Sequence, residues 1–161
     1  MSVRSLRVDV AQQRLYLLNN EQVVNTLSCS TARLGVGEHK GSEQTPRGWH
    51  CVRAMVGANQ PRGAVYVGRR PTGEIWSQVL ADRYPDRDWI LTRILWLCGM
   101  EPGLNRLGEV DSMQRYIYIH GTPPSEPMGV PRSHGCIRLH DDEIIELFSF
   151  VSPGTKVLIQ A

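Results

Sequence analysis

The chain has 161 residues, of which 41% are hydrophobic and 21% are charged, and its formal net charge is +2. This length suits a single domain, 1–161, that can bury a substantial core without disulfides or a bound metal. A charge this close to neutral, with no dense run of Lys and Arg, argues against a nucleic-acid partner, and no apolar run reaches the roughly 18 residues of a membrane helix.

The first residues, MSVRSLRVDV, alternate like a strand and show no apolar segment that ends in a small-residue cleavage site. The sequence therefore predicts no secretory leader and a cytoplasmic location, or a periplasmic one if a leader has been removed. In such a chain the cysteines are expected to be free thiols. Cys29, Cys51 and Cys98 lie in apolar runs and are predicted to be core thiols.

Alternation of apolar and polar residues predicts strands in the first part of the chain, at 6–10, 15–17, 22–30, 50–56 and 64–67. Asn19-Asn20 predicts a hairpin turn between the second and third of these runs. A glycine-rich loop at 34–48 separates the third run from the fourth. The first half is thus expected to be a β-rich layer.

The middle of the sequence is ambiguous. The stretch 75–84 fits a short helix or an irregular loop, and 89–98 is apolar at nearly every position, which fits a buried strand or a helix. The stretch 101–115 contains Pro and Gly and is predicted to be a long loop, a feature that is usually functional in a compact domain.

The last third is clearer. A strand is predicted at 116–120, a proline-rich loop at 121–135, and a helix at 141–151 that Asp141 can cap and Pro153-Gly154 ends. A strand at 155–160 closes the chain. Together these elements predict a mostly β domain with one C-terminal helix.

The segment SHGCIRL at 133–139 carries the clearest chemistry. A thiol such as that of Cys136 attacks well only as thiolate, and a free pKa of about 8.5 leaves little thiolate at neutral pH. A nearby imidazole can take the proton, and the sequence offers His134 and His120. We expect His120 to be the general base, because it ends a predicted strand and is followed by Gly121, so its ring projects from a fixed backbone. His134 is the alternative.

The neighbours of Cys136 suggest further roles. Gly135 lets the backbone turn sharply, so that the amides of Gly135 and Cys136 can form an oxyanion hole. Arg138 shares the face of Cys136 if this segment is a strand, and its guanidinium can hold a substrate carboxylate. Tyr118 shares the strand face of His120 and is predicted to line the pocket.

These motifs resemble those of the L,D-transpeptidase family, with its YkuD-type catalytic domain. IHGT at 119–122, Gly129 and SHGCIRL match the family signature at its usual spacing. VDVAQQRLYLL near the start, SEQTPRG at 42–48, and the closing DDEIIELF and PGTKVLI are also similar to family segments. The resemblance covers nearly the whole chain and is weakest between positions 75 and 93.

The resemblance implies a sandwich-like β fold in which Cys136 attacks a peptidoglycan stem peptide. The bond attacked joins the L-centre of the third residue, typically diaminopimelate, to D-alanine. It further implies that the Gly121 carbonyl orients the ring of His120 and that His134, Ser133, Thr122 and Arg138 shape the site. No cofactor is implied, and carbapenem-type β-lactams are expected covalent inhibitors.

Many members of this family are exported and carry wall-binding modules, and neither feature is seen in this sequence. We therefore expect a cytoplasmic L,D-carboxypeptidase that trims tetrapeptides during murein recycling. A wall-remodelling transpeptidase that forms 3,3 cross-links is the alternative.

Two other classes of function are alternatives for this sequence. His120, His134, Cys136 and His140 are competent zinc ligands, but their spacing matches no common zinc pattern. A binding module without turnover is the other alternative, and metal analysis together with alkylation of Cys136 would separate all three.

Overall fold

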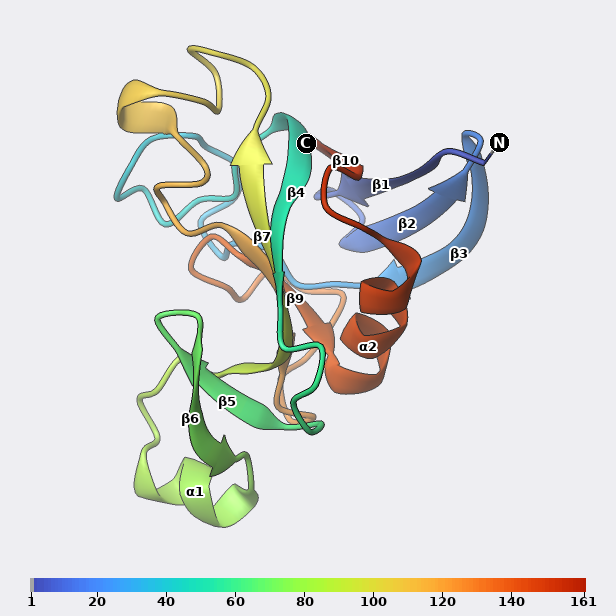
Figure 1. Ribbon diagram of the computed structural model, residues 1–161. Helices are drawn as coiled ribbons and strands as arrows, with labels where there is room; N and C mark the ends of the chain where they lie inside the picture. Colours follow the sequence, from blue (N-terminus) through green and yellow to red (C-terminus); the bar gives the residue numbers. More distant parts are fainter. Residues whose placement is uncertain (1) are drawn as a thin grey trace.

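The computed structural model describes residues 2–161. Within this range the strands are β1 (Arg4–Asp9), β2 (Arg14–Asn19), β3 (Gln22–Ser28), β4 (Gly48–Val56), β5 (Ala64–Val67), β6 (Arg70–Ile75), β7 (Ile90–Gly99), β8 (Tyr118–Thr122), β9 (Ile137–His140) and β10 (Lys156–Gln160). They form one curled sheet in the order β3-β2-β1-β10-β4-β7-β5-β6, from which β8 and β9 branch at β7 (Figure 1). The prediction of a mostly β fold is confirmed.

The helices are α1 (Gln78–Arg83), the 3-10 turn η1 (Gly108–Val110) and α2 (Asp141–Phe150). The predicted C-terminal helix is therefore present, and α1 lies in the stretch 75–84 that the sequence left open. The prediction that Asp141 caps α2 is wrong. The cap residue is His140, and the Asp141 carboxylate instead accepts a hydrogen bond of 2.6 Å from the Thr92 hydroxyl on β7. No helix within residues 2–161 is long and apolar enough to cross a membrane.

Several strand boundaries differ from the predicted ones. The hairpin turn is centred on Asn20-Glu21 rather than Asn19-Asn20, because Asn19 pairs with Gln22 and both turn residues have positive φ. The stretch 89–98 is a strand, β7. Strand β6 was not predicted, because its residues are mostly exposed and lack apolar alternation, as suits the last strand of the order.

Strand β8 begins at Tyr118 and runs to Thr122, two residues beyond His120. The prediction of a strand at 116–120 is thus shifted. Parallel pairing with β9 extends the strand at its end, from Ile119 opposite Ile137 to Thr122 opposite His140. At the other end, Tyr116 has a φ of +57° and its side chain is exposed. His120 therefore lies inside the strand.

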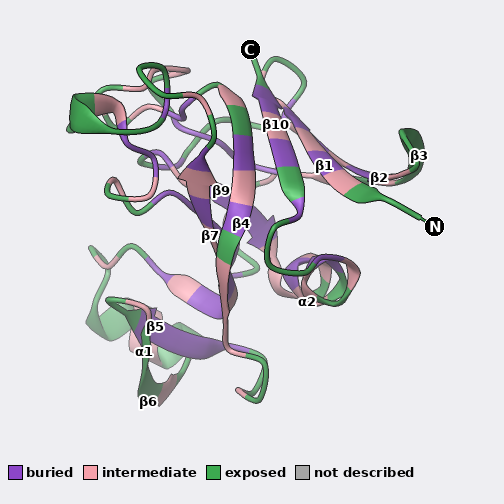
Figure 2. Ribbon diagram, turned by 45° about the horizontal axis from the view of Figure 1, so that its top comes forward, coloured by how far each residue is buried: buried purple, intermediate pink, exposed green. Residues whose placement is uncertain are grey.

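The main core lies between the curled sheet and α2. Ile144 and Leu147 on α2 are fully buried, and the helix packs against β7, β8 and β9. Figure 2 shows buried residues along the central strands and exposed residues toward β6 and the N-terminus of β1. Burial of each large aliphatic side chain contributes roughly 1.5–3 kcal/mol. This packing fixes β8 and β9, which carry the candidate site.

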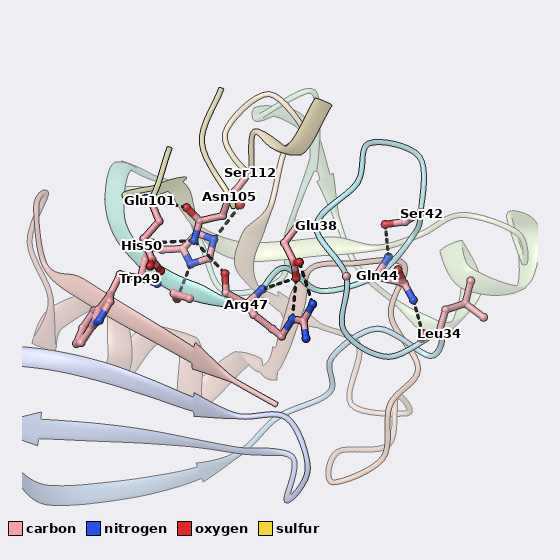
Figure 3. Close-up of polar contacts among 12 residues, drawn as sticks. Leu34, Glu38, Ser42, Gln44, Arg47, Trp49, His50, Glu101, Asn105 and Ser112 are labelled. Atoms are coloured by element: carbon pink, nitrogen blue, oxygen red, sulfur yellow. Dashed lines mark hydrogen bonds and ion pairs between the residues drawn. The ribbon is translucent and has the colours of Figure 1, made fainter. Parts of the chain in front are cut away.

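A buried polar network anchors the start of β4 (Figure 3). The His50 ring is fully buried, with Nδ1 3.0 Å from the Gly48 carbonyl and Nε2 2.8 Å from the Ser112 hydroxyl. The Asn105 amide donates to the carbonyls of Arg47 and Trp49. The network joins β4 to the long loop 101–115, so that this predicted loop is ordered by hydrogen bonds.

The burial of His50 predicts a loss of stability in acid. Burial lowers the pKa of His50 from 6.5 to about 4, so between these values the unfolded chain binds more protons than the folded one. Stability is therefore lost as the pH falls through this window, by roughly 3 kcal/mol from this residue. Urea unfolding at about pH 7, 5.5 and 4 measures the free energy of unfolding, and His50→Gln should make it depend less on pH. The same pH dependence in the variant and the wild type would contradict the assignment.

Candidate active site

A cleft of about 480 Å³ opens beside β8 and the start of β9. Cys136 and His120 both line it, together with Tyr118, Arg138 and, from the β5–β6 turn, Arg69. His134 lines it as well, so the cleft collects a thiol, two imidazoles and two guanidinium groups.

The pairing of β8 with β9 explains why these side chains meet. The two strands are parallel, and His120 lies opposite Arg138. Cys136, one residue before β9, consequently lies next to Tyr118, whose backbone N–H donates to Sγ at 3.3 Å. The thiol in turn donates to the Tyr116 carbonyl at 3.4 Å.

The turn before Cys136 is held on both sides. Gly135 has a φ of +133°, a conformation that favours glycine, and its carbonyl accepts a 2.9 Å hydrogen bond from the Thr45 hydroxyl. The Ser133 hydroxyl donates to the Cys136 carbonyl and accepts from the Gly135 N–H at 3.2 Å. Both amides were predicted to donate to an oxyanion. The Gly135 amide already donates to Ser133, so only the Cys136 amide remains for this role.

His120 is buried and its tautomer is defined by one contact. Its Nδ1 lies 2.7 Å from the Gly121 carbonyl, which only accepts hydrogen bonds. Nδ1 therefore carries the proton and Nε2 keeps its lone pair. Burial lowers the pKa of His120, against the opposing effects of the Gly121 carbonyl and Asp88. The ring is neutral at neutral pH and is able to accept a proton.

The thiol is also neutral in the open cleft. Burial raises the pKa of Cys136 to about 12, although the Tyr118 N–H and the charges of Arg138 and Arg115 oppose this rise. A pre-formed thiolate–imidazolium pair is thus disfavoured. The arrangement suits a reaction in which the proton leaves the sulfur only as the sulfur attacks.

Arg138 is nearly buried, and its side chain is 7% exposed. Its guanidinium lies 2.9 Å from the Asp88 carboxylate and 3.4 Å from that of Glu126. Asp88 also lies 3.5 Å from Nδ1 of His134. Two carboxylates offset the cost of burying this charge. The sequence did not indicate that Asp88 and Glu126 pair with Arg138, because charged residues in loops are usually solvated.

Arg69 is a second cation of the cleft that the sequence did not reveal. Its guanidinium lies 4.6 Å from the ring centroid of Trp96 and 4.8 Å from that of Tyr116. It also donates to the Tyr118 hydroxyl at 2.9 Å. The two rings and the hydroxyl fix the position of its charge beside the thiol-bearing strand.

The family model of the L,D-transpeptidase catalytic domain, YkuD, matches residues 4–159. The chain belongs to the L,D-transpeptidase family. ErfK/SrfK of Salmonella typhimurium is 29% identical over 155 residues, which cover 94% of this chain and 42% of the relative. YqjB of Bacillus subtilis is 51% identical over 41 residues, which cover 26% of this chain and 23% of the relative. The matched segments thus cover less than half the length of either relative.

Solved structures of this family share the fold. L,D-transpeptidase 3 from Mycobacterium tuberculosis, in complex with a faropenem-derived adduct, has a TM-score of 0.61 at 17% identity, covering 99% of this chain and 61% of that chain. An L,D-transpeptidase from Mycobacterium smegmatis has a TM-score of 0.57 at 19% identity, covering 99% and 59%. The L,D-transpeptidase fold expected from the family resemblance is thereby confirmed, with its β-strands in one curled sheet.

Most of the residues predicted for an L,D-transpeptidase site lie together. The cleft is lined by Cys136, His120, His134, Tyr118, Ser133 and Arg138. Gly121 follows His120 and supplies the carbonyl beside its ring. Thr122 is not among the lining residues. Its hydroxyl donates to the Leu139 carbonyl at 2.9 Å, and it borders two neighbouring cavities instead.

The zinc alternative requires His140 to approach the other three candidate ligands. His140 instead has its Nε2 2.8 Å from the Glu126 carbonyl, and it lines a different cavity. Among residues 2–161, no group of three or more His, Cys, Asp or Glu side chains could hold a metal ion.

The raised pKa of Cys136 predicts how its reactivity depends on pH. The rate of its alkylation by iodoacetamide should rise about tenfold per pH unit from about pH 7 to about pH 10, without a plateau. Peptide mapping after timed quenching measures this rate at Cys136. Fully buried Cys29 is the internal control and should react only after unfolding. A plateau near the free thiol value of about 8.5 would refute the prediction.

Proposed function

We propose that this domain transfers the acyl group of peptidoglycan tetrapeptide stems, with Cys136 as nucleophile and His120 as general base. The bond cleaved joins the L-centre of the third residue, typically diaminopimelate, to the terminal D-alanine. The observation that carries this proposal is one cleft of an L,D-transpeptidase domain that holds a thiol together with a neutral imidazole whose Nε2 has a free lone pair.

Acylation begins with proton transfer. His120 Nε2 takes the proton of the Cys136 thiol as Sγ attacks the carbonyl carbon, and negative charge develops on the carbonyl oxygen. The Tyr118 N–H, 3.3 Å from Sγ, stabilises charge on the sulfur, and the Cys136 amide is the donor proposed for the oxygen. The imidazolium then returns its proton to the departing amine of D-alanine, which leaves a thioester on Cys136.

We propose hydrolysis as the main fate of this thioester. Water is present in vast excess, so the acyl group goes to water unless an amine is held in position. The products are then tripeptide and free D-alanine, as in L,D-carboxypeptidase action during murein recycling. The cytoplasmic location stays a prediction, and cell fractionation of the native protein checks it.

Transpeptidation is the second candidate, and a neighbouring cavity favours it. This cavity, of about 240 Å³, meets the cleft at Asp88, His134 and Arg138. Its walls also carry the carboxylates of Asp86 and Glu126 and the guanidinium groups of Arg87 and Arg132. An acceptor whose amine lay against these carboxylates would compete with water for the thioester.

Arg138 is proposed to bind the D-alanine carboxylate. Its present partners include Asp88, whose side chain is 46% exposed and which lies at the junction of the two cavities. A substrate carboxylate that displaced Asp88 would form a charge-assisted, two-pronged contact with the guanidinium. Internal peptide bonds lack such a carboxylate, so this contact would select chain ends.

Carbapenem-type β-lactams are proposed covalent inhibitors. A faropenem-derived adduct is present in the solved L,D-transpeptidase 3 from Mycobacterium tuberculosis, and another solved relative, LdtMt1, is in complex with imipenem. In this chain Sγ of Cys136 would attack the strained lactam carbonyl, and the opened ring would stay attached as a thioester. The adduct gives a direct readout of the acylation step.

The two histidines should differ in this acylation step. His120→Ala should slow adduct formation with imipenem by roughly 10²–10⁴-fold, the range for loss of a general base, while His134→Ala should slow it less. Timed intact-mass spectra measure the adduct, and Cys136→Ala should show none. Should His134→Ala prove the slower variant, the base is wrongly assigned.

The products from free tetrapeptide decide between the two fates. Mass spectrometry should show tripeptide in excess over 3,3-linked dimer, and Cys136→Ala should give neither. Arg138→Lys, which keeps the charge beside Asp88 and Glu126, should raise KM for tetrapeptide. Circular dichroism confirms that the variant is folded. A dominant dimer overturns the hydrolase proposal in favour of the transpeptidase, and an unchanged KM refutes the role of Arg138.

A further inference from the structure

Two cysteines outside the cleft lie opposite each other on neighbouring strands of the sheet. Cys51 on β4 and Cys98 on β7 are directly opposed in the antiparallel register, and their Sγ atoms lie 2.9 Å apart. Cys29 is fully buried, as predicted for a core thiol. The same prediction is wrong for Cys51 and Cys98, because both are partly exposed.

The backbone geometry suits a covalent bond between these two thiols. Directly opposed residues of antiparallel strands have Cα atoms about 4.5–5.5 Å apart, within the range of about 4.4–6.8 Å found for disulfides. Two thiolates on a tetrahedral zinc would lie farther apart, at about 3.8 Å for bonds of about 2.3 Å. The contact of 2.9 Å is too short for a metal bridge, and the two sulfur atoms need to approach by only about 0.9 Å to reach the disulfide bond length of about 2.0 Å.

The pair is also accessible to a small reagent. Cys51 and Cys98 line a cavity of about 440 Å³ whose walls include the exposed guanidinium groups of Arg53 and Arg106. The cavity also holds the carboxylate of Asp111, which accepts hydrogen bonds from the backbone N–H groups of Leu107 and Gln114. Two positive charges against this one negative charge favour a negatively charged disulfide over a neutral one. None of the residues that line this cavity lines the cleft of Cys136.

We propose that Cys51 and Cys98 form a reversible disulfide by exchange with an anionic low-molecular-weight disulfide of the glutathione type. One of the two protein thiols loses its proton and attacks one sulfur of the reagent, which forms a mixed disulfide and expels one thiolate. The other protein thiol then loses its proton and attacks the protein sulfur of the mixed disulfide, which closes the protein disulfide and expels the second thiolate. The two protons lost by the protein thiols end on the two released thiols, so the protein is oxidised by two electrons and the reagent is reduced by two.

Contact between the two sulfur atoms favours the second step. Both thiols line the cavity, so either can meet the reagent first. Once one of them carries the mixed disulfide, the other is already in contact with the sulfur that it must attack. The mixed disulfide is thus short-lived.

The test treats the native protein with oxidised glutathione, blocks the remaining thiols with N-ethylmaleimide and maps the peptides without reduction. We expect a disulfide-linked peptide pair that contains Cys51 and Cys98, a mass loss of about 2 Da before blocking, and full reversal by dithiothreitol. Cys51→Ser is the matched variant. It should stop at the mixed disulfide and gain about 305 Da on Cys98, because the second attack is missing.

Three results with the wild-type protein would overturn the proposal. They are labelling of both thiols by N-ethylmaleimide after oxidation, accumulation of a stable mixed disulfide, and a bridge that involves Cys29 or Cys136. The same treatment of Cys136→Ala must give the same disulfide, since the proposal does not depend on the acyl-transfer function. Loss of the bridge in that variant would also count against it.

Discussion

Parallel pairing between β8 and β9 is the constraint on which the site depends. The register sets His120 opposite Arg138 and leaves Cys136 one residue before the paired segment, beside Tyr118. A shift of one residue would exchange the two faces of β9, because side chains alternate along a strand. The side chains that now face the cleft would then face the core. Ile119 and Ile137, buried and opposed in the same register, prevent that shift. The core thus holds the catalytic geometry in place.

Burial then sets the protonation state of the two reactive groups. It raises the pKa of Cys136 and lowers that of His120, so both are neutral when the cleft is open. Separating charge between them is costly until new charge develops on a bound carbonyl. This arrangement keeps the thiol from reacting freely with small electrophiles, whereas a substrate that places its carbonyl against the sulfur makes the proton transfer productive. Burial of Cys136 and His120 therefore explains both why the thiol is selective for a bound substrate and why it is activated only during attack.

Much of the fold could be predicted from local patterns, and the site only in part. Alternation located β1 and β2, and the strand face of His120 with the segment around Cys136 located the centre of the cleft. Arg69, Asp88 and Glu126 could not be found, since only tertiary structure brings these loop residues to the cleft and to the cavity beside it. The contact between Cys51 and Cys98 depends on a strand register interrupted by an irregularity between Val52 and Ala54, which no local pattern specifies.

The sheet order also has a consequence for how the chain folds. Strand β10 lies between β1 and β4, parallel to the first and antiparallel to the second (Figure 1). The N-terminal three-stranded meander β1–β2–β3 therefore joins the rest of the sheet through residues 156–160. During synthesis, this meander can form as soon as it emerges. The edge of β1 that pairs with β10 then stays unpaired until nearly all of the domain has been made. Contacts of such sequence separation are slow to form, so this edge is the place where a growing chain is most exposed to pairing with another molecule.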